Sequence, residues 1–517
     1  MISNVFTGSV VGIEGYKITV EVDTSQSLPG LTVVGLPDAA VSEAKERIRS
    51  AIKNSGYSFP TKKIVINLAP ADIKKEGSGF DLPMAIGVLA TALEFDPDAL
   101  NTLGFIGELS LDGSLRGVNG VLPVVSCLKK EGIEKVFVPK DNAIEAALVD
   151  GIEVYPASNL SEVVEFILPG SISEFKIQQF KINVREYLEK ANKQISQIDF
   201  KDVKGQEQAK RALEIAAGGG HNILMSGPPG SGKTLLAKSF RNILPPLELI
   251  EAIELSKIYS VSGLLDKDIP LITIRPFRSP HHLASSVGII GGGANPKPGE
   301  ISLAHRGVLF LDEVVEFPRN VLEVLRQPLE DGTVVISRAQ LSVKYPADFM
   351  LLAAMNPCPC GYFGDKQKPC SCNEFQVQKY ISRISGPLLD RIDIQINVPR
   401  LSQDELMGYT KEGESSEQVR ERVVKAREVQ LKRFKEDNII TNSQMTPRLI
   451  KKYCKLDSNA ENLLKTAITR FNLSARAYDR ILKLSRTIAD IYGSKNIETR
   501  HIGEAVQYRN LERLFKG

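Results

Sequence analysis

The stretch "NILMSGPPGSGKT", Asn222 to Thr234, decides the fold of the middle of the chain. An apolar run typical of a buried strand leads directly into Gly-x-x-x-x-Gly-Lys-Thr, and the helical pattern "LLAKSF" follows. Glycines let the backbone turn its N–H groups toward phosphate, and the start of a helix adds the positive end of its dipole. The pattern predicts a P-loop nucleotide-binding domain in which Lys233 neutralises phosphate oxygens and Thr234 ligates Mg²⁺. A chance glycine turn is the alternative, and the strand before and helix after it argue against it.

Two later apolar runs end on polar residues in the way that this fold requires. "GVLFLDEV" ends in Asp312 and Glu313, and "FMLLAAM" is followed by Asn356. Polar groups at the carboxyl ends of parallel strands lie where α/β sheets bind ligands. We expect Asp312 to hold Mg²⁺ through water, Glu313 to polarise the attacking water, and Asn356 to sense the γ-phosphate or the water. For Asp312 and Glu313 the alternative is an exposed acidic turn.

The stretch "RISGPLLDRIDI" carries Arg383 and Arg391. An arginine supplied to a neighbouring subunit's nucleotide would make ATP turnover depend on assembly. From spacing alone, a surface salt bridge is the better explanation for either arginine.

Length and composition bound the rest of the chain. Its 517 residues suggest roughly three domains, with 42% hydrophobic and 25% charged residues and a net charge of +3. No run of about 18 apolar residues predicts a membrane span, and the first residues do not resemble a secretion signal, so we expect no membrane association and cytoplasmic residence. The near-neutral charge neither requires nor excludes nucleic acid.

The chain divides by pattern. From Met1 to about Pro169, strand patterns such as "KKIVINLAP" alternate with helical ones such as "AAVSEAKERIRSAIKNSG", which predicts an α/β domain. Residues 170–199 are polar and are interpreted as a linker. Residues 401–517 are predicted to be helical, with helix starts at Thr446-Pro447, Ser474 and Thr499.

Long stretches of this sequence resemble the magnesium-chelatase-like AAA+ ATPases, and most closely their YifB/ComM family. These are "DFKDVKGQEQAKRALEIAAGGGHNILMSGPPGSGKT", "RPFRSPHHLASSVGIIGGGANPKPGEISLAHRGVLFLDE" and, in the N-terminal part, "VINLAPADIKKEGSGFDLPMAIGVLA". The resemblance implies an α/β protein with a Lon-protease-like (ribosomal S5 domain 2-like) domain over 1–169. It further implies an AAA+ P-loop core with a parallel sheet over 200–400 and a C-terminal helical lid, or magnesium-chelatase-like C-terminal domain, over 401–517.

The resemblance also assigns residues by motif. Asp312 and Glu313 match the Walker B motif, Asn356 the first sensor, Arg391 the arginine finger and Arg476 the second sensor, with Arg383 and Arg480 as rivals for the last two roles. The Walker A loop is matched by Gly227, Pro228, Pro229, Gly230, Ser231, Gly232, Lys233 and Thr234.

The N-terminal domain departs from the pattern of a working Lon-type protease. Such enzymes pair a serine with a lysine that activates it. In "KEGSGFDLPMA" Asp81 stands where the serine is expected, and the later segment "GSLRGVNGVLPVV" has no lysine. Ser78 is therefore interpreted as a turn residue, and the domain as a scaffold or DNA-facing ring rather than a peptidase.

An insert between the two Walker motifs, Arg275 to Glu300, projects toward the central channel in the family. Arg338 belongs to "DGTVVISRAQLSV", which is predicted to form a hairpin with an Asp-Gly turn. The candidates for contacts with DNA phosphates are Arg275, Arg278, Lys297 and Arg338. His281 and His282 are expected to have structural or hydrogen-bonding roles, because adjacent residues do not easily ligate one metal ion.

The resulting hypothesis is an ATP- and Mg²⁺-dependent homo-hexameric motor on single-stranded or branched DNA. It would act as a helicase or branch-migration factor in recombination or natural transformation. The alternative is an ATP-driven protein remodeller akin to the magnesium chelatase motor. A Lon-like peptidase is disfavoured by the missing lysine.

Four of the six cysteines lie in "MNPCPCGYFGDKQKPCSC", directly after Asn356. Cys358 and Cys360 with Cys370 and Cys372 can supply four thiolates to a tetrahedral, structural Zn²⁺. Reduced thiols in an ordinary loop and a regulatory disulfide are the alternatives.

Overall fold

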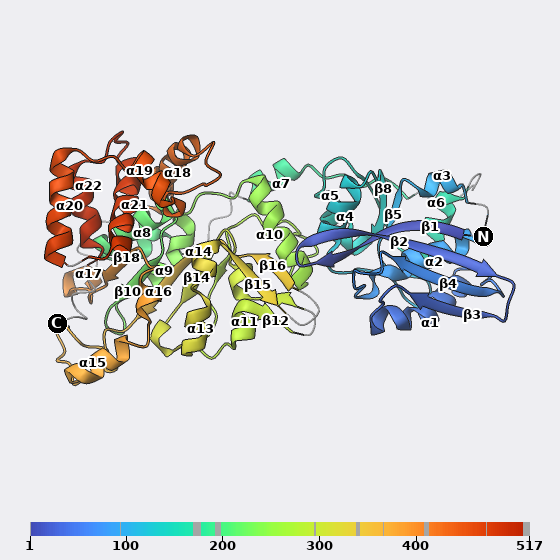
Figure 1. Cartoon of the computed structure of the whole chain (residues 1–517), viewed down its shortest axis with the longest axis horizontal. Coiled ribbons are helices and arrows are strands. Elements are labelled where there is room, and N and C mark those ends of the chain that lie inside the picture. Colours follow the sequence, from blue (N-terminus) through green and yellow to red (C-terminus); the bar gives the residue numbers. More distant parts are fainter. Residues whose placement is uncertain are drawn as a thin grey trace. The chain divides into compact units, whose positions relative to one another are not determined.

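The computed structural model describes residues 2–93, 95–168, 177–191, 198–293, 296–337, 342–365, 367–407, 413–471 and 473–509. The chain forms two compact units (Figure 1). The N-terminal unit consists of Met1–Ala191 and Glu248–Thr273, and the P-loop unit consists of Asn192–Leu247 and Ile274–Gly517. Across the described ranges, no helix combines the length and the apolar composition needed to cross a bilayer.

The P-loop unit is built on a five-stranded sheet whose strands are all parallel. The order is β11-β14-β17-β10-β18, with bounds Phe277–Arg278, Val308–Leu311, Met350–Met355, Ile223–Ser226 and Ile394–Asn397. Every residue of β10, β14 and β17 is buried, as expected for strands covered on both faces. The predicted parallel sheet is confirmed, and its three predicted strands are neighbours in it.

Helices cover this sheet and share its hydrophobic core. Two of them flank the P-loop strand, α8 (Glu207–Gly219) before it and α9 (Lys233–Phe240) after it. The C-terminal helices are α18 (Ser416–Arg433), α19 (Pro447–Tyr453), α20 (Ser458–Phe471), α21 (Ala475–Ile491) and α22 (Thr499–Gln507). One buried apolar cluster runs from the sheet into these helices, so they pack on the sheet.

The predicted helix starts hold with one correction. Ser474 caps α21 by accepting a hydrogen bond from the Ala477 N–H, and Pro447 is the first residue of α19. Thr499 is already the first residue of α22, and its capping residue is Glu498, whose side chain and that of His501 form a capping box.

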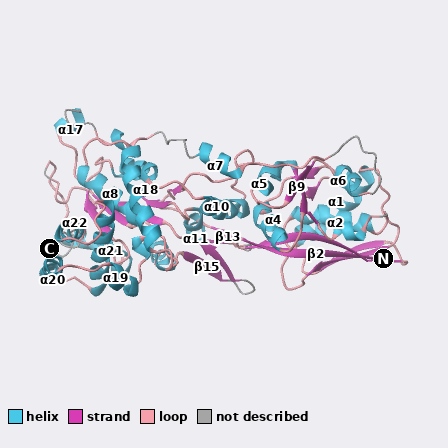
Figure 2. Ribbon diagram, turned by 90° about the horizontal axis from the view of Figure 1, so that it is seen from above, coloured by secondary structure: helices cyan, strands magenta, loops and turns pink. Residues whose placement is uncertain are grey.

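The N-terminal unit has a mixed seven-stranded sheet (Figure 2). Its order is β3-β4-β2-β1-β5-β8-β9, with bounds Gly30–Val34, Lys63–Ala69, Glu14–Ser25, Ile2–Val11, Leu103–Phe105, Lys135–Pro139 and Glu153–Ala157. Val5 and Phe6, neighbours on β1, contribute to different apolar clusters, because successive side chains point to opposite faces. One cluster includes α1 (Ala39–Asn54), α2 (Asp81–Ala90) and α6 (Leu160–Ile167), and the other α4 (Val121–Lys130) and α5 (Ala143–Ala147).

A segment from the middle of the chain completes the N-terminal unit. Residues 248–273, which the sequence places inside the P-loop core, include α10 (Leu249–Ser262) and belong to the N-terminal unit. The Ser260 hydroxyl donates to the buried Glu145 carboxylate at 2.6 Å, and Lys267 pairs with Asp141 at 2.6 Å. Burial raises the pKa of Glu145, and hydrogen bonds from Ser260 and the Leu122 N–H oppose that shift. Within the expected linker, Val184–Ala191 form α7.

The hairpin predicted near residue 333 exists, but its turn was assigned wrongly. Strands β15 (Thr333–Ser337) and β16 (Ser342–Pro346) pair antiparallel. Gly332 lies before β15 and caps the short helix α14 (Pro328–Asp331) in the left-handed conformation. The Asp-Gly pair therefore ends a helix, and Arg338 lies outside the described residues.

Candidate nucleotide-binding site

Three strand ends bring the predicted P-loop and acidic residues together. The Gly227 N–H donates to the Met355 carbonyl at 3.2 Å, which joins the end of β10 to the end of β17. The Thr234 hydroxyl donates to the Asp312 carboxylate at 2.7 Å, and the Lys233 ammonium lies 3.4 Å from the Asn356 side-chain oxygen. Residues up to 128 positions apart, Gly227 and Met355, thus converge at the carboxyl ends of these strands, called the carboxyl edge of the sheet below.

The glycines of the loop have distinct tasks. Gly230 and Gly232 have φ of +76° and +90°, in the left-handed region that favours glycine. At Gly227 an added Cβ would lie 2.1 Å from the Val398 carbonyl oxygen, so only glycine fits there. Helix α9 begins at Lys233, which aims its first N–H groups at the loop.

Lys233 is held inside the loop by carbonyl oxygens. Its ammonium donates to Gly227 O at 2.7 Å and to Pro228 O at 3.0 Å, and only 9% of the residue is exposed. Burial lowers the pKa of Lys233 to about 8, against the opposing effect of the Asp312 and Glu313 charges. The ammonium is therefore poised beside the place where an anion would enter.

The acidic residues suit a hard cation and an attacking water. The Thr234 hydroxyl and Asp312 carboxylate, 2.7 Å apart, are oxygen ligands of the kind that Mg²⁺ prefers. Glu313 adopts a left-handed backbone with φ of +49°, and 56% of its side chain is exposed. His282 Nδ1 lies 3.9 Å from its carboxylate, so one of the two predicted structural histidines faces the proposed water-polarising group.

Two predicted arginines lie at the opposite, amino ends of the strands, called the amino edge of the sheet below. The Asn222 side chain, directly before β10, donates to the Arg391 carbonyl at 2.9 Å. From Asn222 to Gly227 the strand rises about 16 Å, which is longer than an arginine side chain. Arg391 pairs there with Glu330, and Arg476 pairs with Asp390 at 3.2 Å. Neither arginine is close to the P-loop of its own chain.

The rival arginines occupy different places. Arg383 pairs at 3.1 Å with Glu316, three residues after Glu313, and so lies on the acidic side of its own site. Arg480 is largely buried, donates to the Ile392 carbonyl and faces Asp393 at 3.6 Å. Burial lowers the pKa of Arg480, which fits a packed structural group.

The residues predicted to contact DNA lie in two kinds of environment in the structure. The Arg275 guanidinium donates to the carbonyls of Pro245, Pro246 and Arg306, and Arg278 binds the Glu300 carboxylate with two bonds of 2.6 and 2.7 Å. Protein groups therefore engage both arginines, and their contacts with DNA phosphates stay predictions. Lys297, on the short strand β13 (Lys297–Pro298), is exposed.

The polar side chains of the N-terminal glycine-rich segment are hydrogen-bonded to other residues of the same unit. The buried Asp81 carboxylate accepts two bonds from Arg47, at 2.8 and 3.0 Å, and one from the Leu109 N–H. Burial raises the pKa of Asp81, while Arg47 opposes that shift. Ser78 donates to Glu108 and the Lys75 amine donates to the Pro70 carbonyl, so these two residues do not form a serine–lysine pair.

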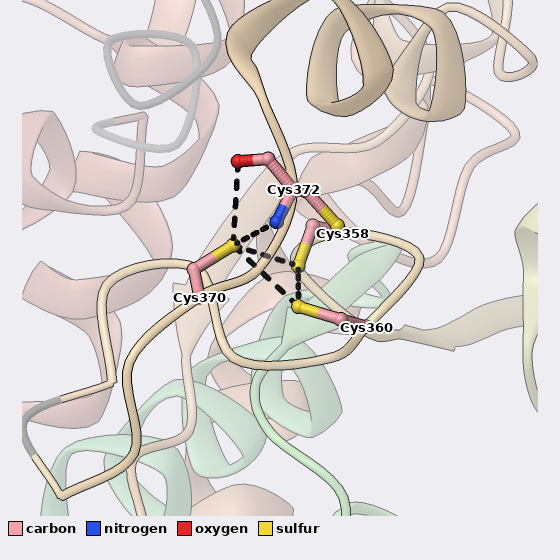
Figure 3. Close-up of side chains that lie close together, drawn as sticks. All are labelled: Cys358, Cys360, Cys370 and Cys372. Carbon is pink, nitrogen blue, oxygen red and sulfur yellow. Dashed lines mark hydrogen bonds between the residues drawn. The ribbon is translucent and has the colours of Figure 1, made fainter.

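The four clustered cysteines converge on one point (Figure 3). All four sulfur atoms lie within 4.8 Å of one another, and Cys358 is fully buried. Each is a free thiol. Burial opposes ionisation of Cys360, but N–H groups of Tyr362 and Ser371 outweigh it and lower the pKa of this thiol to about 5.

Two residues that support the site carry no distinct sequence signal. Gln206, in a left-handed conformation, donates to the carbonyls of Ser231 at 3.2 Å and Pro399 at 2.6 Å, which ties the P-loop to the end of β18. His221 is fully buried and bridges Asp393 at 3.0 Å and Thr487 at 2.8 Å, which fixes α21 to the sheet. Both act through partners distant in sequence, so spacing does not reveal them.

Comparison with known proteins gives three family matches along the chain. The family described as magnesium chelatase, subunit ChlI, matches residues 199–406, its C-terminal region matches 413–509, and a further ChlI subunit family matches 20–142. The competence protein ComM of Haemophilus influenzae is 44% identical over 514 residues, with 99% of this chain and 98% of that protein covered. YifB of Escherichia coli matches with the same identity and coverage. A 67 kDa magnesium-chelatase subunit of Heliobacterium mobile is 28% identical over 190 residues, covering 31% of this chain and 28% of that subunit.

The parallel sheet and the P-loop site define a nucleotide-binding protein of the AAA+ type. The extent of the match makes the assignment more specific: the chain belongs to the magnesium-chelatase-like YifB/ComM family. Membership implies ATP hydrolysis with Mg²⁺ in general terms.

Proposed function

We propose that the protein is an ATP-hydrolysing ring motor that moves on DNA. The observation that carries this proposal is a P-loop site in a chain that is 44% identical, over 99% of its length, to a protein named for competence. Competence is the uptake of DNA, which suggests a DNA helicase or branch-migration factor in natural transformation or recombination.

In this proposal each group at the P-loop edge has one task. The N–H groups of Gly227 to Gly232 and the Lys233 ammonium bind the phosphates, while Thr234 and Asp312 hold Mg²⁺, which supplies charge neutralisation on the phosphate oxygens. Glu313 accepts a proton from the attacking water, and Asn356 orients that water or the γ-phosphate. Lys233 must leave its carbonyl partners to reach a phosphate.

The proposed assembly is a homo-hexamer in which one chain completes the site of the next. Arg391 and Arg476 lie at the far edge of the sheet from their own P-loop, so both suit a role toward a neighbour's nucleotide. Arg383 remains the rival on the near side. A ring would bring the two edges of adjacent sheets together.

DNA is proposed to contact the insert between Arg275 and Glu300. Lys297 is exposed, and so are Leu283 at 80% and Val287 at 50% in the same insert. A cation with apolar neighbours on projecting loops can contact both phosphates and bases. Arg338, which follows β15 in the sequence, stays a candidate.

The flanking parts have supporting roles in the proposal. The N-terminal unit would be a Lon-protease-like scaffold without peptidase activity, because Asp81 is paired with Arg47 and Ser78 with Glu108. The C-terminal helices would form the lid that carries Arg476. The proposed cofactors are ATP, Mg²⁺ and a structural Zn²⁺ held by Cys358, Cys360, Cys370 and Cys372.

DNA-dependent ATPase activity tests this function. We expect branched or single-stranded DNA to raise the ATPase rate of the full chain at low salt, and the stimulation to fall as salt rises, because phosphate contacts release counterions. The matched variant Lys297→Gln should weaken stimulation and lower the salt slope while the DNA-free rate stays the same. A rate that DNA leaves unchanged at low salt would reject the DNA motor.

A protein remodeller is the second candidate. It is favoured by the partial similarity to the Heliobacterium mobile magnesium-chelatase subunit. A remodeller would hydrolyse ATP with the same P-loop residues, so only the response to DNA separates the two.

A further inference from the structure

We infer that the four-cysteine cluster binds one Zn²⁺ and that this ion braces the P-loop, so that metal occupancy sets the affinity for ATP. The inference rests on the proposed function only in taking ATP as the ligand of the P-loop. It does not depend on DNA.

The sulfur positions suit a single tetrahedral ion. The separations are 3.3 Å for Cys358 and Cys360, 3.5 Å for Cys360 and Cys370, and 3.7 Å for Cys358 and Cys370 (Figure 3). Zn–S bonds of about 2.3 Å place the corners of a tetrahedron about 3.8 Å apart. Four sulfur ligands close the coordination shell, which is typical of structural zinc. An iron–sulfur cluster holds its cysteines farther apart, since iron and sulfide lie between them.

The first pair of ligands is joined directly to the nucleotide site. Cys358 follows Asn356 by two residues, and Asn356 contacts Lys233. Gly361, directly after Cys360, packs on the P-loop: an added Cβ would lie 2.7 and 2.9 Å from Cδ and Cγ of Pro229. Its φ of +86° fixes the backbone turn that makes this approach.

The same loop is held from a second side. Asp365 pairs with Arg400 at 2.8 Å, and the Arg400 guanidinium lies 5.2 Å from the centre of the Tyr362 ring. Arg400 follows the segment whose Val398 carbonyl packs against Gly227. Residues 358–365 thus touch the P-loop through Pro229 and are anchored beside Gly227.

The ion supplies the cross-link that this arrangement needs. It ties Cys358 and Cys360 to Cys370 and Cys372 and so closes the intervening loop. This closure lowers the conformational entropy of the loop before ATP binds. Without it, Gly361 is no longer pressed against Pro229, and the P-loop must be ordered by ATP itself. Because ordering the P-loop costs free energy when ATP binds, it lowers the apparent affinity for nucleotide. The hydrolysis rate of the bound complex is not affected.

Metal content and ATP affinity together test the inference. We expect one zinc per chain in purified full-length protein, and loss of that zinc in Cys370→Ser. Binding of a fluorescent ATP analogue should weaken about tenfold in this variant. The matched control Cys127→Ser changes a cysteine outside the cluster and should keep both zinc and affinity. Iron in place of zinc, absence of metal, or full affinity after zinc loss would overturn the inference.

Gly361→Ala separates the contact from the metal. It should retain one zinc per chain and still bind the ATP analogue more weakly, because the methyl group meets Pro229. Unchanged affinity with zinc bound would show that the loop does not brace the P-loop. Since these measurements use no DNA, a failed DNA stimulation leaves them intact, and their failure leaves the motor proposal intact.

Discussion

The carboxyl edge and the amino edge of the five-stranded sheet carry different charged and polar groups. At the carboxyl edge, Lys233, Thr234 and Asp312 converge around a place for a phosphate and a cation. At the amino edge, Arg391 and Arg476 are paired with the acidic residues Glu330 and Asp390. One edge therefore holds most of an ATP site and the other holds cations that its own ATP cannot use. This difference is the basis of our proposal that hydrolysis needs two chains.

Removing the cation of the carboxyl edge should have the largest effect. A hydrogen bond to a charged group contributes up to about 3 kcal/mol, so Lys233→Ala should weaken ATP binding by about 100-fold and reduce turnover to background. The comparison variant Glu313→Gln should bind ATP normally and lose about 10³-fold in turnover, as expected for loss of a general base. Equal loss of affinity in both, measured by equilibrium binding, would contradict the assigned roles.

Removing the cation of the amino edge should spare binding. Arg391→Ala should keep ATP affinity and lose on the order of 10³-fold in turnover if the arginine acts on a transferring phosphoryl group. Mixing it with the Lys233→Ala chain should restore part of the ATPase rate, because some interfaces then combine an intact P-loop with an intact arginine. A mixture as inactive as its components would assign the role within one chain and favour Arg383.

The smallest expected effect is a pH dependence confined to the carboxyl edge. Burial lowers the pKa of Lys233 to about 8, so its ammonium is present below that pH and is lost above it. We expect kcat/KM for ATP to fall about tenfold between pH 7 and 9, since this ratio reports the free enzyme. Lys233→Arg keeps its charge and should give a flatter profile. A flat wild-type profile would mean that the amine stays protonated in the free site.

The sequence allowed the carboxyl edge to be predicted because its signals are local. A buried strand followed by glycines, or by two acidic residues, indicates both the fold and the position of the polar groups. The insert between Arg275 and Glu300 shows its charges in the sequence but not their partners: nothing near Arg275 or Arg278 reveals the carbonyls and the carboxylate that engage them. The Asp-Gly pair predicts a turn but caps a helix, because a helix cap and a hairpin turn both favour glycine with positive φ.

Helix α10 has a practical consequence for anyone who divides this protein. The chain passes from one unit to the other three times, near residues 191, 247 and 273. A gene fragment that stops at residue 191 would omit the hydroxyl of Ser260, leaving the Glu145 carboxylate without one of its partners. A single protease cut between 191 and 248 would not set either unit free.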